Sequence, residues 1–221
     1  MGKLIVIEGA CDGIGKSTQT RLLKEELQKE GKLITHHFPS YGEPQAKDVE
    51  KYLAGDYGKV GELDPKVVNG FYANDRKETW DKQLKPKYEE GSTILLDRYT
   101  TSSLIYQSAL METEEEKKEF IDYVVNYEYS ILGIGKPDLV IFLYADFDLA
   151  MRLKKEREDS NKSVADIHEK DLSYMRKVYD NAMFIADYLN WSKVKCDEDD
   201  RMRSIEDIHE DVYRLVKKMD K

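Results

Sequence analysis

The sequence predicts a single α/β domain built on a parallel sheet with helices on both faces. Short apolar runs alternate along the chain with longer segments of helical periodicity, and strands that are joined through helices run parallel. Hydrophobic residues occupy 40% of the 221 positions, which is enough for one sizeable core. No internal repeat, low-complexity tract or linker rich in Pro, Gly or Ser divides the sequence. We therefore expect one domain over residues 1–221.

Five apolar runs predict the strands of this sheet. The first spans residues 4–7 and ends at Glu8-Gly9, the pattern of a buried strand that leads into a loop. Three more have the same character and a fifth is weaker; they are residues 33–38, 93–96, 139–144 and 191–196.

Amphipathic segments predict the helices between and after these strands. Residues 17–29 carry leucines at helical spacing and are followed by Gly31, a residue typical of helix ends. Residues 65–88 and 205–216 carry further apolar stripes. Residues 156–170 interrupt the rhythm because they are polar, charged and poor in apolar side chains. We expect a short mobile lid there, and a solvated loop without function is the alternative.

The segment EGACDGIGKST, residues 8–18, lies directly between the first strand and the first helix, which is the context that a phosphate-binding P-loop requires. Its glycines let backbone N–H groups converge on an anion, and the helix N-terminus adds partial positive charge. In this arrangement Lys16 contacts the β and γ phosphates of ATP, and the Ser17 hydroxyl faces Mg²⁺. The predicted ATP-binding residues are Ala10, Cys11, Asp12, Gly13, Ile14, Gly15, Lys16, Ser17 and Thr18.

This loop departs from the strict pattern, which places a glycine five positions before Gly15, where the sequence has Ala10. Either Ala10 replaces that glycine, or the loop has one extra residue between Gly9 and Asp12. We expect an extra residue to bulge outward, which would place Cys11 at the mouth of the site with a reactive thiol. The alternative for Cys11 is a small buried hydrophobe, which free cysteine often is.

A P-loop alone binds a nucleotide without specifying a reaction, so a nucleotide-dependent switch protein is the alternative from a different class. A GTPase-type switch needs a guanine-reading Asn-Lys-x-Asp motif. The only Asn-Lys pair, Asn161-Lys162, is followed by Ser-Val. The sequence therefore disfavours a switch.

A second motif, DRYTTSSLIYQ at residues 97–107, follows the third predicted strand. An aspartate at the carboxyl end of a strand can hold Mg²⁺ through water, which predicts that role for Asp97, and the adjacent Arg98 can clamp an acceptor phosphate. A simple surface ion pair is the alternative for these two residues.

This motif resembles thymidylate kinases, whose pattern is Asp-Arg-Tyr, two free positions, Ser, two free positions and Ala-Tyr-Gln; only Ile105 departs from it. FPSYG at residues 38–42 and FYANDR at residues 71–76 are similar to two further elements of the family, and the likeness extends from Lys3 to about Asp187. The resemblance implies a P-loop kinase three-layer sandwich with five parallel strands in the order 2-3-1-4-5. It also implies ATP-dependent phosphorylation of dTMP to dTDP with Mg²⁺ as cofactor.

The same resemblance implies roles for individual residues. Tyr72 would stack on the thymine ring, Arg76 would hydrogen-bond its O4 edge, and Tyr106 would pack against the sugar and favour deoxynucleotides. Ser103 stands where relatives often have an asparagine that faces the base. The implied dTMP-binding residues are Phe38, Pro39, Tyr41, Tyr72, Arg76, Arg98, Ser103, Tyr106 and Gln107.

Members of the family carry a catalytic basic residue either in the P-loop or in the lid. Asp12 is followed here by Gly13 and Ile14, so the lid must supply that residue. The candidates are Arg152, Lys154, Lys155, Arg157 and Lys162, with Arg157 preferred. The implied catalytic set is Asp12, Lys16, Arg98 and Arg157. The lid segment DIHEKD, residues 166–171, is similar to the family's Asp-x-x-Glu element, and the implied metal-binding residues are Ser17, Asp97 and Glu169.

Charge and cysteine content restrict the partners. The formal net charge is −9, with 44 acidic against 35 basic residues, so the surface as a whole repels a phosphate backbone. No run approaches membrane-spanning length, and two distant cysteines fit a reducing compartment. We expect a cytoplasmic enzyme that binds ATP and dTMP, and neither nucleic acid nor membrane; the resemblance implies a homodimer. A deoxynucleoside kinase or a UMP/CMP-type kinase of the same superfamily is the alternative.

Overall fold

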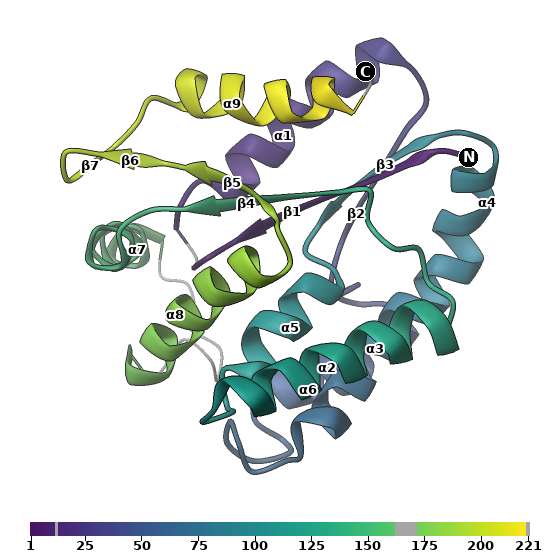
Figure 1. Ribbon diagram of the computed structural model, residues 1–221, viewed down its shortest axis with the longest axis vertical. Coiled ribbons are helices and arrows are strands. Elements are labelled where there is room, and N and C mark those ends of the chain that lie inside the picture. The colour runs from purple at the N-terminus through teal and green to yellow at the C-terminus, as the bar shows by residue number, and fades with distance from the viewer. Residues whose placement is uncertain (12, 162–171, 220–221) are drawn as a thin grey trace.

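The fold is a parallel five-stranded sheet in the order β2-β3-β1-β4-β5, as seen in the computed structural model in Figure 1. The structure describes residues 1–11, 13–161 and 172–219, and side chains 157–161 are not described. The strands are β1 (Lys3–Gly9), β2 (Leu33–His37), β3 (Thr93–Asp97), β4 (Leu139–Tyr144) and β5 (Ser192–Lys195). All five predicted strands and their predicted order are confirmed.

Strand register places three polar side chains at the same edge of the sheet. Ile7 of β1 lies opposite Asp97 of β3 on one side and Ile141 of β4 on the other. Glu8 and Asp97 therefore stand where the central strands end, and Arg98 begins the next turn. The carboxyl edge of a parallel sheet is the usual place for ligands in this fold class.

Alternation along the strands sends side chains to two separate cores. Ile5, Ile7 and Leu95 pack with α1 (Lys16–Glu30) and α9 (Ile205–Lys218) on one face. Leu4 and Val6 point to the opposite face, which is covered by α3 (Pro65–Thr79), α5 (Thr100–Ser108), α6 (Glu114–Val125) and α8 (Leu172–Tyr188). The result is the predicted three-layer sandwich (Figure 1).

The remaining elements are short or lie at the periphery. They are the 3-10 turn η1 (Pro44–Ala46), α2 (Lys47–Ala54), the π-helical segments η2 (Trp80–Leu84) and η3 (Asn126–Ile131), α4 (Lys85–Glu89), α7 (Phe147–Asn161), β6 (Asp197–Glu198) and β7 (Arg201–Met202). The helix predicted over residues 65–88 is observed as α3, η2 and α4 in succession. No helix of the described chain is long and apolar enough to cross a bilayer.

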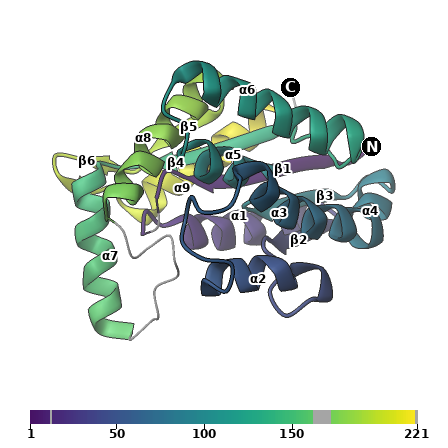
Figure 2. The ribbon, with the colours of Figure 1, turned by 90° about the horizontal axis from the view of Figure 1, so that it is seen from below.

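The segment predicted as a lid is only partly described. Residues 156–161 belong to helix α7, so the alternative of a solvated loop is wrong for them. Residues 162–170 lie outside the described part of the chain, and the lid stays a prediction. Helix α7 projects beyond the carboxyl edge of the sheet (Figure 2). Residues 154–161 carry charges of both signs and no apolar side chain, so apolar periodicity did not reveal this part of the helix.

Candidate active site

The loop between β1 and α1 has the backbone of a phosphate cradle. Gly13 and Gly15 adopt φ values of 94° and 90°, a left-handed region that glycine enters without steric cost. Helix α1 begins at Lys16 without a side-chain cap, so the N–H groups of its first turn are available to an anion. Ser17 is exposed at the same helix end. Asp12 lies outside the described residues.

Upstream of the glycines, the chain stays inside the protein. Ala10 is 1% exposed and its N–H donates to the Leu143 carbonyl at 2.9 Å, so it continues alongside β4. Cys11 is 2% exposed and packs in the core shared with Ile14 and Ala150. The predicted outward bulge with Cys11 at the mouth of the site is therefore wrong, and the buried alternative holds. The side chains of residues 10 and 11 are therefore not available to phosphates, and the Ala10 N–H is already bonded to Leu143.

Lys16, Asp97 and His37 form a charged cluster where the loop meets β3. The Lys16 ammonium lies 2.5 Å from one Asp97 oxygen, and His37 Nδ1 lies 3.0 Å from the other. Burial opposes ionisation of Asp97, but the His37 hydrogen bond and the Lys16 charge outweigh it and hold the Asp97 pKa well below its usual range. The carboxylate therefore stays charged beside the cradle.

Arg98 follows Asp97 and turns toward a neighbouring cavity. Its backbone is left-handed, with φ 64°. Its guanidinium lies 3.7 Å from the buried carboxylate of Glu8 and 3.4 Å from the Tyr106 hydroxyl. Arg98 keeps part of its side chain exposed to the cavity.

That cavity is enclosed by the predicted acceptor residues. The loop after β2, helix α3 and helix α5 supply its walls, and α8 contributes one methionine. The lining residues are His37, Phe38, Pro39, Tyr41, Leu53, Tyr72, Arg76, Arg98, Tyr99, Ser102, Ser103, Tyr106, Gln107 and Met175. All nine residues predicted to bind the acceptor thus line one cavity, beside the Lys16–Asp97 cluster.

At the inner end of the cavity, Arg76 is held by a buried carboxylate. Arg76 Nε and Nη2 donate to the two Glu128 oxygens at 2.7 and 2.6 Å, and Nη2 also donates to Ser103 at 2.8 Å. Arg76 is 1% exposed and Glu128 is fully buried. Burial disfavours the charged guanidinium, but the Glu128 charge outweighs burial and raises the Arg76 pKa. Arg76 therefore presents a fixed, donor-only edge to the cavity.

Three carboxylates that support this site were not predicted. Glu8 and Glu128 hold Arg98 and Arg76, and Asp75 accepts a 2.8 Å hydrogen bond from the Ser40 N–H. The last contact fixes the Phe38-to-Tyr41 loop against α3. Asp75 was already part of the quoted FYANDR segment, whereas Glu128 lies 52 residues from its partner and gave no local signal.

Three of the five candidate lid cations have described side chains. Arg152 Nη2 lies 3.4 Å from Asp200 Oδ1 at the tip of the β6–β7 hairpin, so this side chain is directed away from the transfer site. Lys154 lies beside Gly13 at the base of α7. Lys155 is exposed. The side chain of Arg157 is not described, and Lys162 and Glu169 lie outside the described residues.

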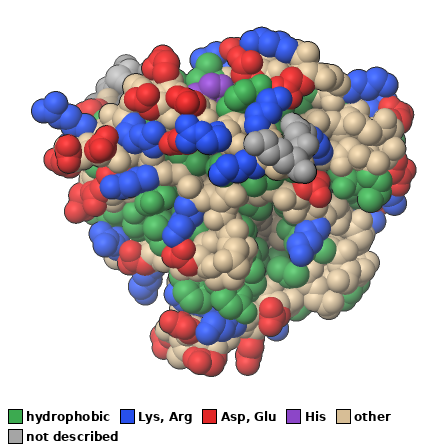
Figure 3. Space-filling view, turned by 45° about the horizontal axis from the view of Figure 1, so that its top comes forward, with side chains coloured by type: hydrophobic (Ala, Val, Ile, Leu, Met, Phe, Trp, Pro, Cys, Tyr) green, Lys and Arg blue, Asp and Glu red, His purple; other side chains and the backbone are tan. Residues whose placement is uncertain are grey.

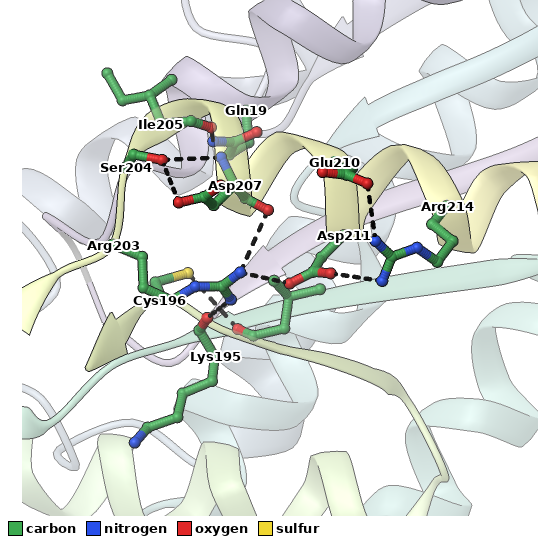
Figure 4. A network of polar contacts seen from close by, with 11 residues as sticks. Gln19, Lys195, Cys196, Arg203, Ser204, Ile205, Asp207, Glu210, Asp211 and Arg214 are labelled. Atoms are coloured by element: carbon green, nitrogen blue, oxygen red, sulfur yellow. Dashed lines mark hydrogen bonds and ion pairs between the residues drawn. The ribbon is translucent and has the colours of Figure 1, made fainter.

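The hairpin is in turn connected to the start of α9 and to α1 (Figure 4). Arg203 donates to the Lys195 carbonyl at 2.6 Å and to Asp211 at 2.7 Å. Gln19, three residues after Lys16, donates to the Ile205 carbonyl at 3.0 Å. These contacts anchor the first turn of α1, and with it the phosphate cradle.

The residues at the cradle fit Mg²⁺ that arrives with a nucleotide. The described chain contains no cluster of three or more His, Cys, Asp or Glu side chains that would cage a metal alone. Mg²⁺ usually keeps several waters and is bound by one or two carboxylates together with substrate phosphates. An exposed Ser17 hydroxyl and an ionised Asp97 supply that kind of donor set.

On the face shown in Figure 3, acidic side chains lie among the basic ones.

Comparisons with known proteins agree with this geometry. The family model described as thymidylate kinase matches residues 7–212. The chain is 34% identical over 186 residues to a probable thymidylate kinase of Saccharolobus solfataricus, an alignment that covers 80% of this chain and 85% of that protein. It is 28% identical over 185 residues to the thymidylate kinase of Chlamydia caviae, covering 83% of each.

Solved structures agree at the level of the fold. The thymidylate kinase of Candida albicans superposes with a TM-score of 0.73 at 22% identity, covering 99% of this chain and 92% of that one. The Ehrlichia chaffeensis thymidylate kinase gives a TM-score of 0.66 at 20% identity, covering 97% and 98%.

Proposed function

The chain belongs to the thymidylate kinase family and phosphorylates dTMP at the expense of ATP, and from this premise we propose how its residues divide the work. ATP lies over the loop from Ala10 to Thr18, and dTMP fills the adjoining cavity. The observation that carries the proposal is that the predicted acceptor residues line one cavity, which opens beside the Lys16–Asp97 cluster. Donor and acceptor phosphates then meet at the carboxyl edge of the sheet.

At the donor side, Lys16 contributes positive charge where the β and γ phosphates bind. In the free protein its ammonium rests on Asp97, so phosphate binding exchanges one anionic partner for another. Ser17 and Asp97 are the residues that would hold Mg²⁺, which when bound would supply positive charge against the charge that spreads over the transferred group. Phosphoryl transfer depends on placement and charge neutralisation, and the protein supplies both by position.

At the acceptor side, Arg98 clamps the dTMP phosphate and aligns it for in-line transfer. The Arg98 guanidinium lies over the Tyr106 ring, 5.7 Å from its centroid. The residue that binds the phosphate and the residue that packs against the sugar are therefore in contact. Tyr106 closes the space that a 2′-hydroxyl would occupy. Asp12 and the lid residues Arg157 and Glu169 complete this part of the proposal on family resemblance alone.

At the base end, Tyr72 stacks on thymine and Arg76 faces the O4 edge. Tyr72 is oriented by Tyr52, whose ring meets it edge-on at 81°. A guanidinium has only donors, so it can donate to the keto oxygen of thymine but cannot pair with the amino group of cytosine, which is also a donor. Phe38, Pro39, Tyr41, Ser103 and Gln107 enclose the rest of the ring.

A homodimer in the cytoplasm completes the proposal. Val67 of α3 is 49% exposed, and Tyr123 of α6 stacks on Tyr127 of η3. Lys66 lies over the Tyr123 ring, so the two helices present one surface. Sedimentation of the enzyme tests this assignment: twice the chain mass supports it, and a monomer at all concentrations refutes it. Cys11 and Cys196 are buried and form no disulfide, which suits a reducing compartment.

A coupled assay with a panel of acceptors tests the substrate assignment. With ATP and Mg²⁺, dTMP should be the fastest acceptor. A missing methyl group is worth about 1 to 3 kcal/mol in an apolar pocket, so dUMP should be tens of fold slower. Faster turnover of thymidine or CMP than of dTMP would refute the substrate assignment.

A further inference from the structure

We propose that Glu8 is a positioning residue for transfer, holding Arg98 in the orientation that receives the acceptor phosphate. The inference rests on the proposed role of Arg98 as phosphate clamp and adds a residue to it. Glu8 is the first residue of the EGACDGIGKST segment, and the proposed function assigns it no role. It stands at the carboxyl end of β1.

The Glu8 carboxylate is itself fixed from several directions. It is fully buried. One oxygen accepts the Gly9 N–H at 3.0 Å and faces Arg98 Nη1 at 3.7 Å. The other oxygen accepts the hydroxyls of Thr101 and Ser102, at 2.8 and 2.5 Å, in the first turn of α5. A buried carboxylate with these hydrogen bonds is rigid and can orient a flexible arginine.

Arg98 needs such an orienting group. A left-handed backbone at a non-glycine residue is unfavourable and persists only where the surroundings determine it. The Arg98 N–H donates to the Ile7 carbonyl at 3.2 Å, which fixes the turn but not the long side chain. Glu8, 3.7 Å away, and Tyr106, 3.4 Å away, both contact the guanidinium, and of these two only Glu8 offers a carboxylate.

The direction in which Glu8→Gln changes kcat/KM for dTMP distinguishes an orienting role of Glu8 from a simple effect of its charge. Removing a negative charge near a phosphate site strengthens the attraction for a dianion. Glu8→Gln would therefore raise dTMP usage if charge alone mattered. A fall in kcat/KM for dTMP identifies lost orientation instead.

A double-mutant cycle tests the inference. We expect Glu8→Gln to lower kcat/KM for dTMP about tenfold or more, on the scale of one positioned group, with KM for ATP unchanged. In an Arg98→Ala background the same substitution should have no further effect, because its target is gone. Asp75→Asn is the matched control: it also alters a buried carboxylate of this cavity, and its effect should persist in that background.

Binding of dTMP and of thymidine supplies a second readout. Thymidine lacks the phosphate, so Glu8→Gln and Arg98→Ala should leave thymidine binding unchanged. Thr101→Val removes one of the two hydroxyls that donate to Glu8, so it should reproduce the Glu8→Gln effect in weaker form. It replaces Glu8→Gln in the test if the Glu8→Gln variant does not fold. Equal losses from Glu8→Gln in both backgrounds would overturn the inference. Normal dTMP usage by Arg98→Ala would instead overturn the proposed clamp.

Discussion

Replacing Glu128 with glutamine should destabilise the protein by about 3 kcal/mol. Glu128 and Arg76 form a pair that is 0% and 2% exposed and is joined by two short hydrogen bonds. Breaking a buried pair costs about 3 to 5 kcal/mol, because the remaining charge is left without compensation. Glutamine keeps one acceptor oxygen, which places the loss at the lower end. Native stability is about 5 to 15 kcal/mol, so this is a large share.

Urea denaturation of the wild type and the variant measures that loss directly. For a chain of this size, 1 kcal/mol shifts Tm by about 2 to 4 °C, so Glu128→Gln should lower Tm by about 6 to 12 °C. Glu90→Gln is the control, because the Lys87–Glu90 pair is about half exposed and should contribute less than about 1 kcal/mol. Equal losses from the two substitutions would refute the reasoning.

The same pair separates stability from base recognition. Replacing both residues with apolar side chains, Arg76→Met with Glu128→Leu, removes the desolvated charges together and should recover much of the stability. The double variant still lacks the guanidinium at the base edge. We therefore expect a folded enzyme with weak dTMP usage, and full dTMP usage would contradict the proposed role of Arg76.

Three further predictions concern single positions. Tyr72→Ala should remove stacking worth about 1 kcal/mol and raise KM for dTMP more than KM for ATP; steady-state kinetics with each substrate varied in turn decides, and an equal rise in both is the contrary result. The pKa of Asp97 is depressed in the folded protein, so Asp97 contributes stability that is complete above its unfolded pKa of about 3.9 and is lost as the pH falls toward the folded value. Asp97→Asn should therefore reduce the loss of unfolding free energy with falling pH. Urea titrations between pH 5 and 2 measure this loss, and an unchanged loss in the variant would speak against the assignment. Cys11 is 2% exposed, and burial raises the pKa of the Cys196 thiol to about 12, so both thiols should resist alkylation until the protein unfolds. Mass spectrometry locates the label, and rapid labelling of Cys11 in the folded enzyme would refute its buried position.

The strands and the phosphate loop were predictable because their signals are local. An apolar run of four to six residues that ends in glycine indicates a buried strand at any position in a chain. Gly-Lys-Ser between a strand and a helix indicates an anion site for the same reason. The acceptor residues came from resemblance to a family, and the structure brings all of them to one cavity.

The supporting carboxylates were not predictable because their partners are distant in the sequence. Glu8 and Thr101 are 93 residues apart, and no local pattern announces that they meet. The burial of Cys11 was likewise open, because a loop pattern does not say which way a side chain points. The β6–β7 hairpin has strands of two residues each, too short for any periodicity.

The most direct test of the account is the steady-state kinetics of Lys16→Ala and Arg98→Ala with ATP and dTMP. Each substitution removes a positioned charge from phosphoryl transfer, so kcat/KM should fall by at least about 100-fold in both. The dTMP-binding defect should be confined to Arg98→Ala, because Lys16 faces the donor. Normal turnover in either variant would contradict the assignment of this cavity and its neighbouring loop as the site of transfer.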